Sequence, residues 1–124
     1  MTLLALVVDD SMLIRHTVCR LLEKRGFQVE IANDGVGALE ALKTIRPSVI
    51  FTDLQMPRLS GPELIGAVQA NPETAHIPLV VLAAKPLSGD VQEPRAYSVI
   101  YKDVNIEKQM KQVLDSLFPA GVTA

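Results

Sequence analysis

Aromatic residues are scarce in this chain, and tryptophan is absent. Two tyrosines and three phenylalanines make up 4% of the 124 residues. Surfaces that bind single-stranded nucleic acid stack bases on aromatic side chains, so this scarcity argues against such a surface. The formal net charge is −2, with acidic and basic residues mixed along the chain, which argues against an anionic partner. We therefore expect neither a nucleic-acid partner nor a membrane partner.

Cysteine and long apolar runs are also lacking. Cys19 is the single cysteine, so the chain cannot form an internal disulfide. This fits a reducing compartment. Residues 1–8 lack the basic segment of a signal peptide and lead directly into two acids. No apolar run approaches the ~20 residues that a membrane-spanning helix needs. We expect a cytoplasmic protein.

The remaining composition is that of one folded domain. Hydrophobic residues make up 48% of the chain, which is more than a disordered chain contains. A chain of this length buries roughly two-thirds of its unfolded surface, enough for a core without disulfides. Residues 1–124 are therefore expected to form one domain, with a core over about 3–118 and a tail over 119–124.

Strand-like and helix-like segments alternate along the chain. Short apolar runs predict five strands, at residues 3–8, 28–32, 49–52, 79–83 and 98–101. Helical spacing and typical capping residues predict four helices, at 11–24, 36–44, 63–70 and 106–118. This alternation is typical of an α/β fold with a parallel sheet and helices on both faces. Alternation also calls for a helix at 85–95, but Pro86, Gly89 and Pro94 leave room for at most a turn or two.

Three aspartates follow two of the predicted strands. Asp9 and Asp10 end the first apolar run, and Asp53 ends the third. In open α/β sheets, ligands bind at the carboxyl ends of the strands. Three acids that converge there repel each other unless a hard cation lies among them, and Mg²⁺ prefers oxygen ligands. The cluster therefore predicts a magnesium site with one carboxylate left to react.

The order and spacing of several short motifs resemble the receiver domain of two-component response regulators, the CheY-like family. The resemblance covers residues 3 to 118. It rests on Asp9-Asp10-Ser11, Asn33-Asp34-Gly35, the segment from Asp53 to Pro57, Gly61, the strand that follows Pro78, and Lys102. The family implies a doubly wound, flavodoxin-like sheet of five parallel strands in the order 2-1-3-4-5.

The resemblance also implies a role for each site residue. Asp53 would accept a phosphoryl group from a phosphohistidine on a sensor histidine kinase or a phosphotransfer protein. Asp10 would ligate Mg²⁺ directly, and Asp9 partly through water. Asp53 and the backbone carbonyl of Gln55 would complete the protein's metal ligands, and Lys102 would contact the phosphoryl oxygens. Such a domain is a phosphoacceptor rather than an enzyme, and the sequence does not indicate its downstream protein partner.

Two positions that the family uses as a switch are altered. The family normally has Thr or Ser where this chain has Ala83, so the hydroxyl that bonds the phosphoryl group is missing. Three residues before Lys102, where the family usually has Tyr or Phe, the chain has Val99. Tyr97 and Tyr101 are near in sequence, and strand alternation would place both on the face of Val99. The resemblance thus implies an atypical receiver, with an intact phosphorylation site and an altered readout.

Two further departures lie near the last strand. The family's fourth helix is expected to be short or disordered here, at 85–95. Asp103 follows Lys102 where the family usually has a proline, often cis. A cis bond before a non-proline residue costs ~3 kcal/mol, so we expect a trans Lys102–Asp103 bond. This leaves open where the lysine points.

The altered positions leave other functions to be weighed. A pseudo-receiver would bind protein partners without phosphate; Ala83 and Val99 favour it, and the intact acids oppose it. A phosphatase resembling haloacid dehalogenases would carry Asp-x-Asp after the first strand, where this chain has Asp9-Asp10. A nucleotide- or flavin-binding domain would need a glycine-rich phosphate motif after a strand, and the sequence has none. A receiver without the usual switch would serve as a phosphate sink or shuttle, or signal through the loop after Asp53 or the first helix.

Overall fold

The sheet contains five parallel strands in the predicted order, β2-β1-β3-β4-β5. The computed structural model describes residues 3–87 and 89–119. The strands are β1 (Leu4–Val8), β2 (Gln28–Ala32), β3 (Val49–Asp53), β4 (Leu79–Ala83) and β5 (Ser98–Tyr101). The helices are α1 (Met12–Lys24), α2 (Gly35–Ala41), α3 (Gly61–Ala70) and α4 (Ile106–Leu117).

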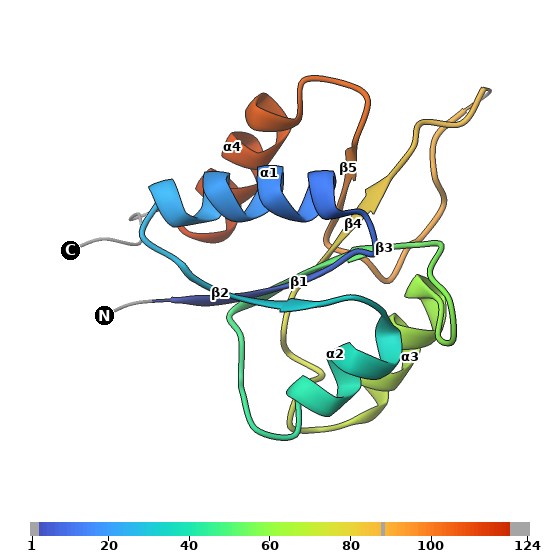
Figure 1. The fold of residues 1–124 in the computed structure, drawn as a ribbon. Helices are drawn as coiled ribbons and strands as arrows, with labels where there is room; N and C mark the ends of the chain where they lie inside the picture. Colours follow the sequence, from blue (N-terminus) through green and yellow to red (C-terminus); the bar gives the residue numbers. More distant parts are fainter. Residues whose placement is uncertain (1–2, 88, 120–124) are drawn as a thin grey trace.

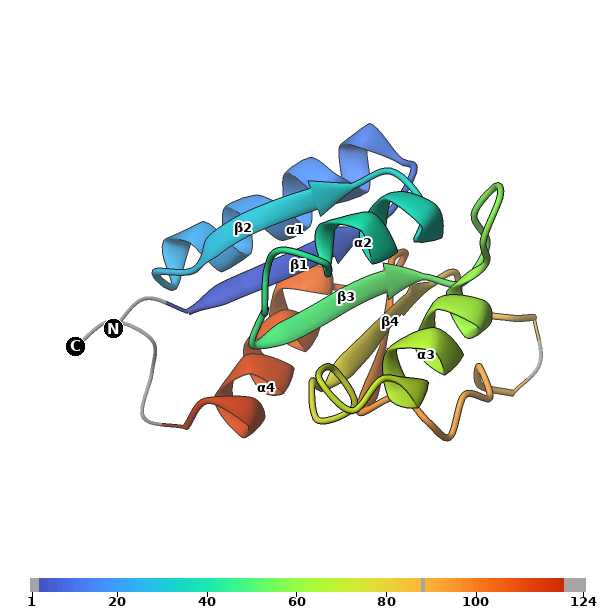
Figure 2. The ribbon, with the colours of Figure 1, turned by 90° about the horizontal axis from the view of Figure 1, so that it is seen from below.

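Helices cover both faces of the sheet, as predicted. Figures 1 and 2 show α1 and α4 on one face and α2 and α3 on the other. Successive side chains of a strand point to opposite faces. In β1, Ala5 and Val7 therefore pack in the core beneath α1 and α4, while Leu6 and Val8 pack in the core beneath α2 and α3. All residues of β3 and β4 are buried, which explains why these strands read as continuous apolar runs.

Capping residues fix where the helices begin. Ser11 accepts a hydrogen bond from the amide of Ile14, as an N-cap residue does, and Asn105 caps α4 in the same way. The third helix begins at Gly61, two residues earlier than predicted. The reason is that Ser60 and Glu63 form a reciprocal capping box, which brings the start of the helix forward.

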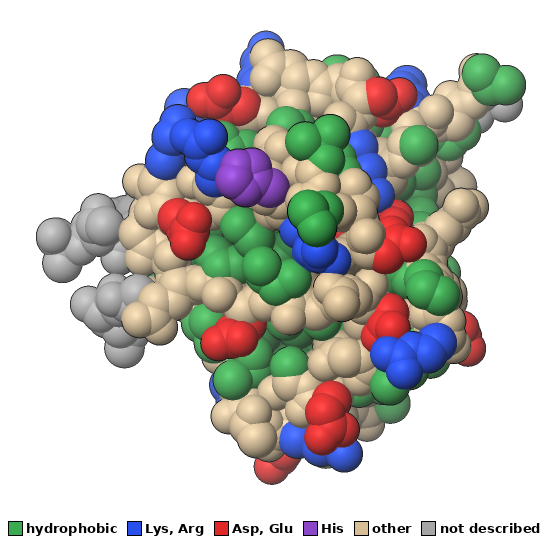
Figure 3. Space-filling model, viewed as in Figure 1, with side chains coloured by type: hydrophobic (Ala, Val, Ile, Leu, Met, Phe, Trp, Pro, Cys, Tyr) green, Lys and Arg blue, Asp and Glu red, His purple; other side chains and the backbone are tan. Residues whose placement is uncertain are grey.

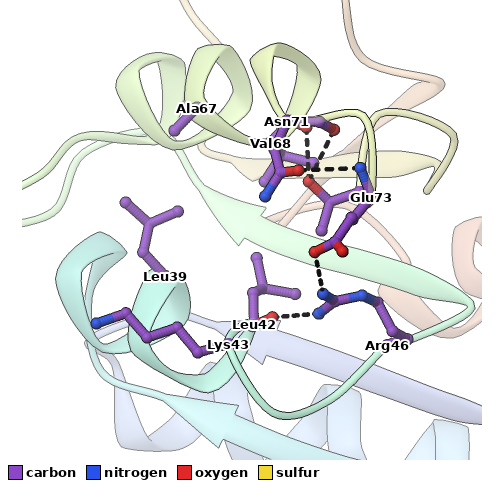
Figure 4. Close-up of a pocket in the computed structure, with 9 residues that line it drawn as sticks. Leu39, Leu42, Lys43, Arg46, Ala67, Val68, Asn71 and Glu73 are labelled. Carbon is purple, nitrogen blue, oxygen red and sulfur yellow. Dashed lines mark hydrogen bonds and ion pairs between the residues drawn. The ribbon is translucent and has the colours of Figure 1, made fainter.

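The second helix is shorter than predicted and ends at Ala41 rather than at residue 44. The amides of Lys43 and Thr44 donate to carbonyls three residues earlier, so the chain tightens there instead of continuing the helix. Arg46 then donates to the carbonyl of Leu42 and forms an ion pair with Glu73, 2.8 Å away (Figure 4). A cavity of about 280 Å³ lies between α2 and α3 at this end, and no predicted site residue lines it.

The connection between β4 and β5 contains no helix among its described residues, 84–87 and 89–97. Pro86 and Pro94 lack the amide hydrogen that a helix interior requires, so the sequence expectation of at most a short helix agrees with the structure. The last helix ends at Leu117, one residue before the predicted end. Of the expected tail, Pro119 is described, and residues 120–124 lie outside the described residues.

The surface mixes charges of both signs with apolar side chains. On the face seen in Figure 3, which is that of Figure 1, basic, acidic and hydrophobic groups are interspersed. Among the described residues, no helix has both the length and the apolar character needed to cross a bilayer.

Candidate functional site

Three carboxylates meet at the carboxyl ends of β1 and β3. These strands are neighbours in the sheet, and Val8 pairs with Thr52, so the acids that follow them lie side by side. One oxygen each of Asp9, Asp10 and Asp53 lies within 4.8 Å of the others. Asp9 is fully buried and Asp53 is 9% exposed, whereas Asp10 is exposed. The structure thus brings together the three acids that the sequence singled out.

Lys102 points directly into this cluster. Its ammonium nitrogen lies 2.8 Å from Oδ2 of Asp9 and 3.2 Å from Oδ1 of Asp53. The amide of Lys102 donates to the carbonyl of Ala83, which anchors the residue beside the end of β4. No cis peptide bond occurs among the described residues, so the bond to Asp103 is trans, as expected. The side chain reaches both acids with this trans bond, which answers the question that the sequence left open.

Burial and charge shape the ionisation of the site. Burial, and then the charge of Asp9, raise the pKa of Asp53, while Lys102 acts in the opposite direction. Burial would lower the pKa of Lys102, but hydrogen bonding and attraction to Asp9, followed by Asp53, outweigh it and raise this pKa. The lysine is therefore a fixed positive charge that partly offsets the repulsion among the acids.

The residues present fit a magnesium ion. Oδ1 of Asp9 accepts a hydrogen bond from the amide of Ser11, 2.8 Å away. Oδ2 is buried without a well-aligned hydrogen bond and has only the ion pair with Lys102 among the described residues. A buried carboxylate oxygen in this condition is costly unless further positive charge lies near it. Hard oxygen donors gathered within a few ångströms are the set that Mg²⁺ takes.

Close packing holds the loop that follows Asp53. The amide of Gly61 donates to the carbonyl of Leu54, 2.9 Å away. A Cβ at Gly61 would lie 2.3 Å from the carbonyl oxygen of Asp53, so only glycine fits there. The amide of Gln55 lies 3.5 Å from Oδ1 of Asp53, at the limit of a hydrogen bond. The backbone of Gln55 is thereby kept beside the carboxylate.

A sequence model of the response regulator receiver domain matches residues 5–114. The chain belongs to this family. The expected resemblance is confirmed, and so is the CheY-like sheet order.

Curated proteins similar to this receiver domain include response regulators. The chain is 36% identical over 127 residues to an uncharacterized response regulatory protein of Vibrio parahaemolyticus, VP0538, covering 98% of this chain and 51% of that protein. Response regulator MprA of Mycobacterium ulcerans is 38% identical over 85 residues, or 68% of this chain and 36% of MprA. The chain therefore spans about a third to a half of the length of these curated relatives.

Solved structures share the fold. Chemotaxis response regulator CheY4 of Vibrio cholerae superposes with a TM-score of 0.81 at 28% identity, over 95% of this chain and 100% of that one. The receiver domain of sensor histidine kinase PA1611 from Pseudomonas aeruginosa superposes with a TM-score of 0.83 at 19% identity, over 94% and 98% of the two chains. That domain holds a magnesium ion coordinated in its active site cleft.

Two arginines on the rim of the receiver site were not predicted from the sequence. Arg58, in the loop after β3, donates two hydrogen bonds to Asp34. Arg15, on α1, donates to the carbonyl of Asp9 and to the side chain of Asn33. Both pairs join segments far apart in the sequence, and no local pattern signals them. Together they tie the loops around the acids to one another.

The altered switch positions are filled by small or aliphatic side chains. Ala83 is buried, and Val99 packs against the core beneath α2 and α3. The two nearby tyrosines have different partners, since the hydroxyl of Tyr97 pairs with Ser116 of α4, and that of Tyr101 bonds the connection before β5. A cavity of about 470 Å³ opens beside Asp53; it is lined by Asp53, Leu54, Gln55, Ala83, Ala84, Lys85, Pro86, Val91 and Lys102.

Proposed function

We propose that this receiver domain accepts a phosphoryl group on Asp53 from a phosphohistidine of a sensor histidine kinase or a phosphotransfer protein. One observation carries the proposal: Lys102 lies 3.2 Å from the carboxylate of Asp53, at the mouth of a cavity large enough for a phosphoryl group. Phosphoryl transfer asks a protein mainly for position and charge neutralisation. This arrangement supplies both.

In the proposed step, a carboxylate oxygen of Asp53 attacks the phosphorus atom. A new oxygen–phosphorus bond forms while the phosphorus–nitrogen bond of the donor breaks, and the electron pair stays on the donor's imidazole. Lys102 offsets the negative charge that approaches Asp53. A Mg²⁺ ion held by Asp9, Asp10, Asp53 and the carbonyl of Gln55 would supply further positive charge for the phosphoryl oxygens. The protein acts as phosphoacceptor and not as an enzyme with turnover of a separate substrate.

The readout of phosphorylation differs from the family's usual one in this proposal. Ala83 offers no hydroxyl to the phosphoryl group, and Val99 offers no aromatic ring. These two residues also favour the second candidate, a pseudo-receiver that binds a protein partner without phosphate. The ion pairs of Lys102 with Asp9 and Asp53 favour the first candidate, because a chain that never meets phosphate gains little from clustering four charges at one edge.

The state of the single cysteine bears on the compartment in which we propose that the protein acts. Its single cysteine, Cys19, is buried, and burial raises the pKa of its thiol, which suits a cytoplasmic protein without disulfides.

The partners that we propose are a phosphohistidine donor and a downstream protein, with neither nucleic acid nor a membrane. Because these relatives are about twice as long, activities of their other segments do not transfer to this chain.

The test is uptake of phosphate from an acyl phosphate, with and without Mg²⁺, followed by intact-protein mass spectrometry. We expect the mass of one phosphoryl group to be added in Mg²⁺, and no addition after chelation. Asp53→Asn should abolish the addition and keep the fold. Failure of the wild-type chain to take up phosphate would overturn the proposal and leave the pseudo-receiver as the better account.

A further inference from the structure

Lys85 belongs to a small network that ties the connection after β4 to the end of β5. Its ammonium group forms an ion pair with Oδ1 of Asp90, 3.2 Å away, and lies 4.8 Å from the centre of the Tyr101 ring. The hydroxyl of Tyr101 donates to the same oxygen of Asp90 and accepts a hydrogen bond from the amide of Val91, 3.1 Å away. One lysine therefore contacts both the Tyr101 ring and the carboxylate that the Tyr101 hydroxyl binds.

The same lysine lines the cavity beside Asp53. Among the described residues around that cavity, Lys85 and Lys102 are the two cations. Lys102 is already engaged with Asp9 and Asp53. Lys85 is held by an exposed ion pair, with side chains 47% and 68% exposed for Lys85 and Asp90, and by its contact with the Tyr101 ring. Exposed ion pairs contribute little to stability, so Lys85 can exchange its partner at small cost.

Charge balance in the phosphorylated site calls for one more cation. An acyl phosphate on Asp53 would carry about two negative charges, and Asp9 and Asp10 one each. Lys102 and a bound Mg²⁺ offset about three of these four charges. The remaining negative charge lies in a partly buried cavity, where attraction is stronger than at the surface. The carboxylate of Asp90, by contrast, is exposed to water.

We propose that Lys85 binds the phosphoryl group on Asp53 and releases Asp90, so that the Tyr101 network reads the phosphorylation state. The proposal rests on the proposed phosphoacceptor function and supplies the readout that Ala83 and Val99 cannot provide. Without the lysine, the Tyr101 ring loses its cation, and Asp90 is left with an uncompensated charge. The hydrogen bond between Tyr101 and the amide of Val91 changes as a result.

Contacts of Tyr101 carry this change to α4. The side-chain amide of Gln109 accepts a hydrogen bond from the amide of Tyr101 and donates one to its carbonyl, both at 2.9 Å. Tyr101 is thus held on one side by the connection after β4 and on the other by α4. We expect the phosphorylated form to alter the environment of Val91, Tyr101 and Gln109 together.

The test is amide NMR of the whole chain with Mg²⁺ and then beryllofluoride, which mimics the phosphoryl group. Fluorine NMR records separately whether the adduct forms. In the wild type we expect the adduct and a shift of the Val91 amide. In Lys85→Met we expect the adduct to form while the Val91 shift falls by more than half. Lys111→Met, which removes an exposed lysine paired with Asp115, should keep the full shift.

The outcomes distinguish the proposed role of Lys85 from the proposed phosphoacceptor function. An adduct in the wild type without a Val91 shift, or an equal shift in Lys85→Met, overturns the role of Lys85 and leaves the phosphoacceptor function standing. Absence of the adduct in the wild type overturns both. Loss of the Val91 shift in Lys85→Met, with the adduct still formed, supports the inference.

Discussion

Arg58 donates two hydrogen bonds to a single carboxylate oxygen of Asp34. Its Nε and Nη2 lie 2.8 and 2.6 Å from Oδ2, while the other oxygen of Asp34 accepts the amide of Gly37 and so caps α2. The pair links the loop after β3 to the start of α2. Arg58 adopts a φ of 69°, a conformation that side-chain-bearing residues rarely take. This loop beside the acids therefore contains a residue of strained backbone conformation whose side chain forms an ion pair with Asp34.

Two substitutions of Arg58 should separate the contribution of the ion pair to stability from the cost of the strained backbone. Arg58→Ala loses the pair and keeps the strained conformation, whereas Arg58→Gly loses the pair and removes the strain. We expect the alanine variant to be less stable than the glycine variant by about 1 kcal/mol in urea unfolding. Equal stabilities of the two variants would show that the positive φ carries no cost here.

Asp34 should make stability depend on pH in the acid range. The amide of Gly37, and then Arg58, lower the pKa of Asp34 below its ordinary value of 3.8. A lowered carboxyl pKa adds stability that is complete above the ordinary value and is lost as the pH falls through the lowered one. In Asp34→Asn, which keeps a capping oxygen, we expect reduced stability at neutral pH. The gap from the wild type should shrink below pH about 4. Unfolding curves recorded at several pH values test this, and a gap that stays constant down to pH about 2.5 contradicts it.

Lys102 should stabilise the fold when magnesium is absent. Removing it in Lys102→Met leaves Asp9 buried without its counter-charge, which we expect to cost roughly 2–3 kcal/mol. Millimolar Mg²⁺ should raise the melting temperature of this variant more than that of the wild type, because the ion restores positive charge and no longer meets the repelling ammonium group. Lys108→Met, on the exposed side of α4, is the control and should behave as the wild type. A variant as stable as the wild type in chelator would contradict this.

Asp10 should affect the affinity for Mg²⁺ strongly and the stability of the fold very little. Because its side chain is exposed and stands close to two other acids, Asp10→Asn relieves repulsion and should leave stability unchanged or slightly raised without metal. We expect Mg²⁺ affinity, measured by NMR titration, to fall by about tenfold or more, since one charged ligand is lost. Unchanged affinity would place the ion elsewhere.

The side chain of Gln109 should stabilise the fold by bonding backbone groups at the end of β5. Its side chain satisfies the amide and carbonyl of Tyr101 and the carbonyl of Val104. We expect Gln109→Ala to cost about 1–2 kcal/mol in thermal or urea unfolding, because these backbone groups lose their partners. Gln112→Ala, on the same helix, is the matched control and should change stability little. Equal effects of the two substitutions would contradict a special role for Gln109.

Most of the fold could be predicted because its determinants are local. Apolar runs defined the strands, and capping residues such as Ser11 and Asn105 defined where helices begin. The meeting of Asp9 with Asp53 followed from one general rule, that parallel strands end at the same edge of a sheet. The end of α2 and the start of α3 were less well predicted. The first depends on the backbone bonds of Lys43 and Thr44, and the second on the capping box of Ser60 and Glu63.

The side-chain contacts that the sequence did not predict join segments that are far apart in the chain. Arg58 and Asp34 are 24 residues apart, and nothing in either neighbourhood marks the other as its partner. The direction of Lys102 depends on how the chain leaves β5, which sequence spacing alone does not define. In the sequence, Tyr101 is notable only as an aromatic residue close to Val99, where the family usually has a ring. Its actual partners, in the connection after β4, were visible only in the folded chain.

The division of the core into two layers has a consequence for how such a domain can evolve. One layer lies beneath α1 and α4 and the other beneath α2 and α3, and β1, β3 and β4 contribute alternate residues to the two. Residues 84–87, 89 and 90 of the connection between β4 and β5 are exposed and lie outside both layers, so substitutions there do not require the strands to repack. A lineage can therefore vary this connection while the buried strands that place Asp9 and Asp53 at one edge of the sheet stay unchanged.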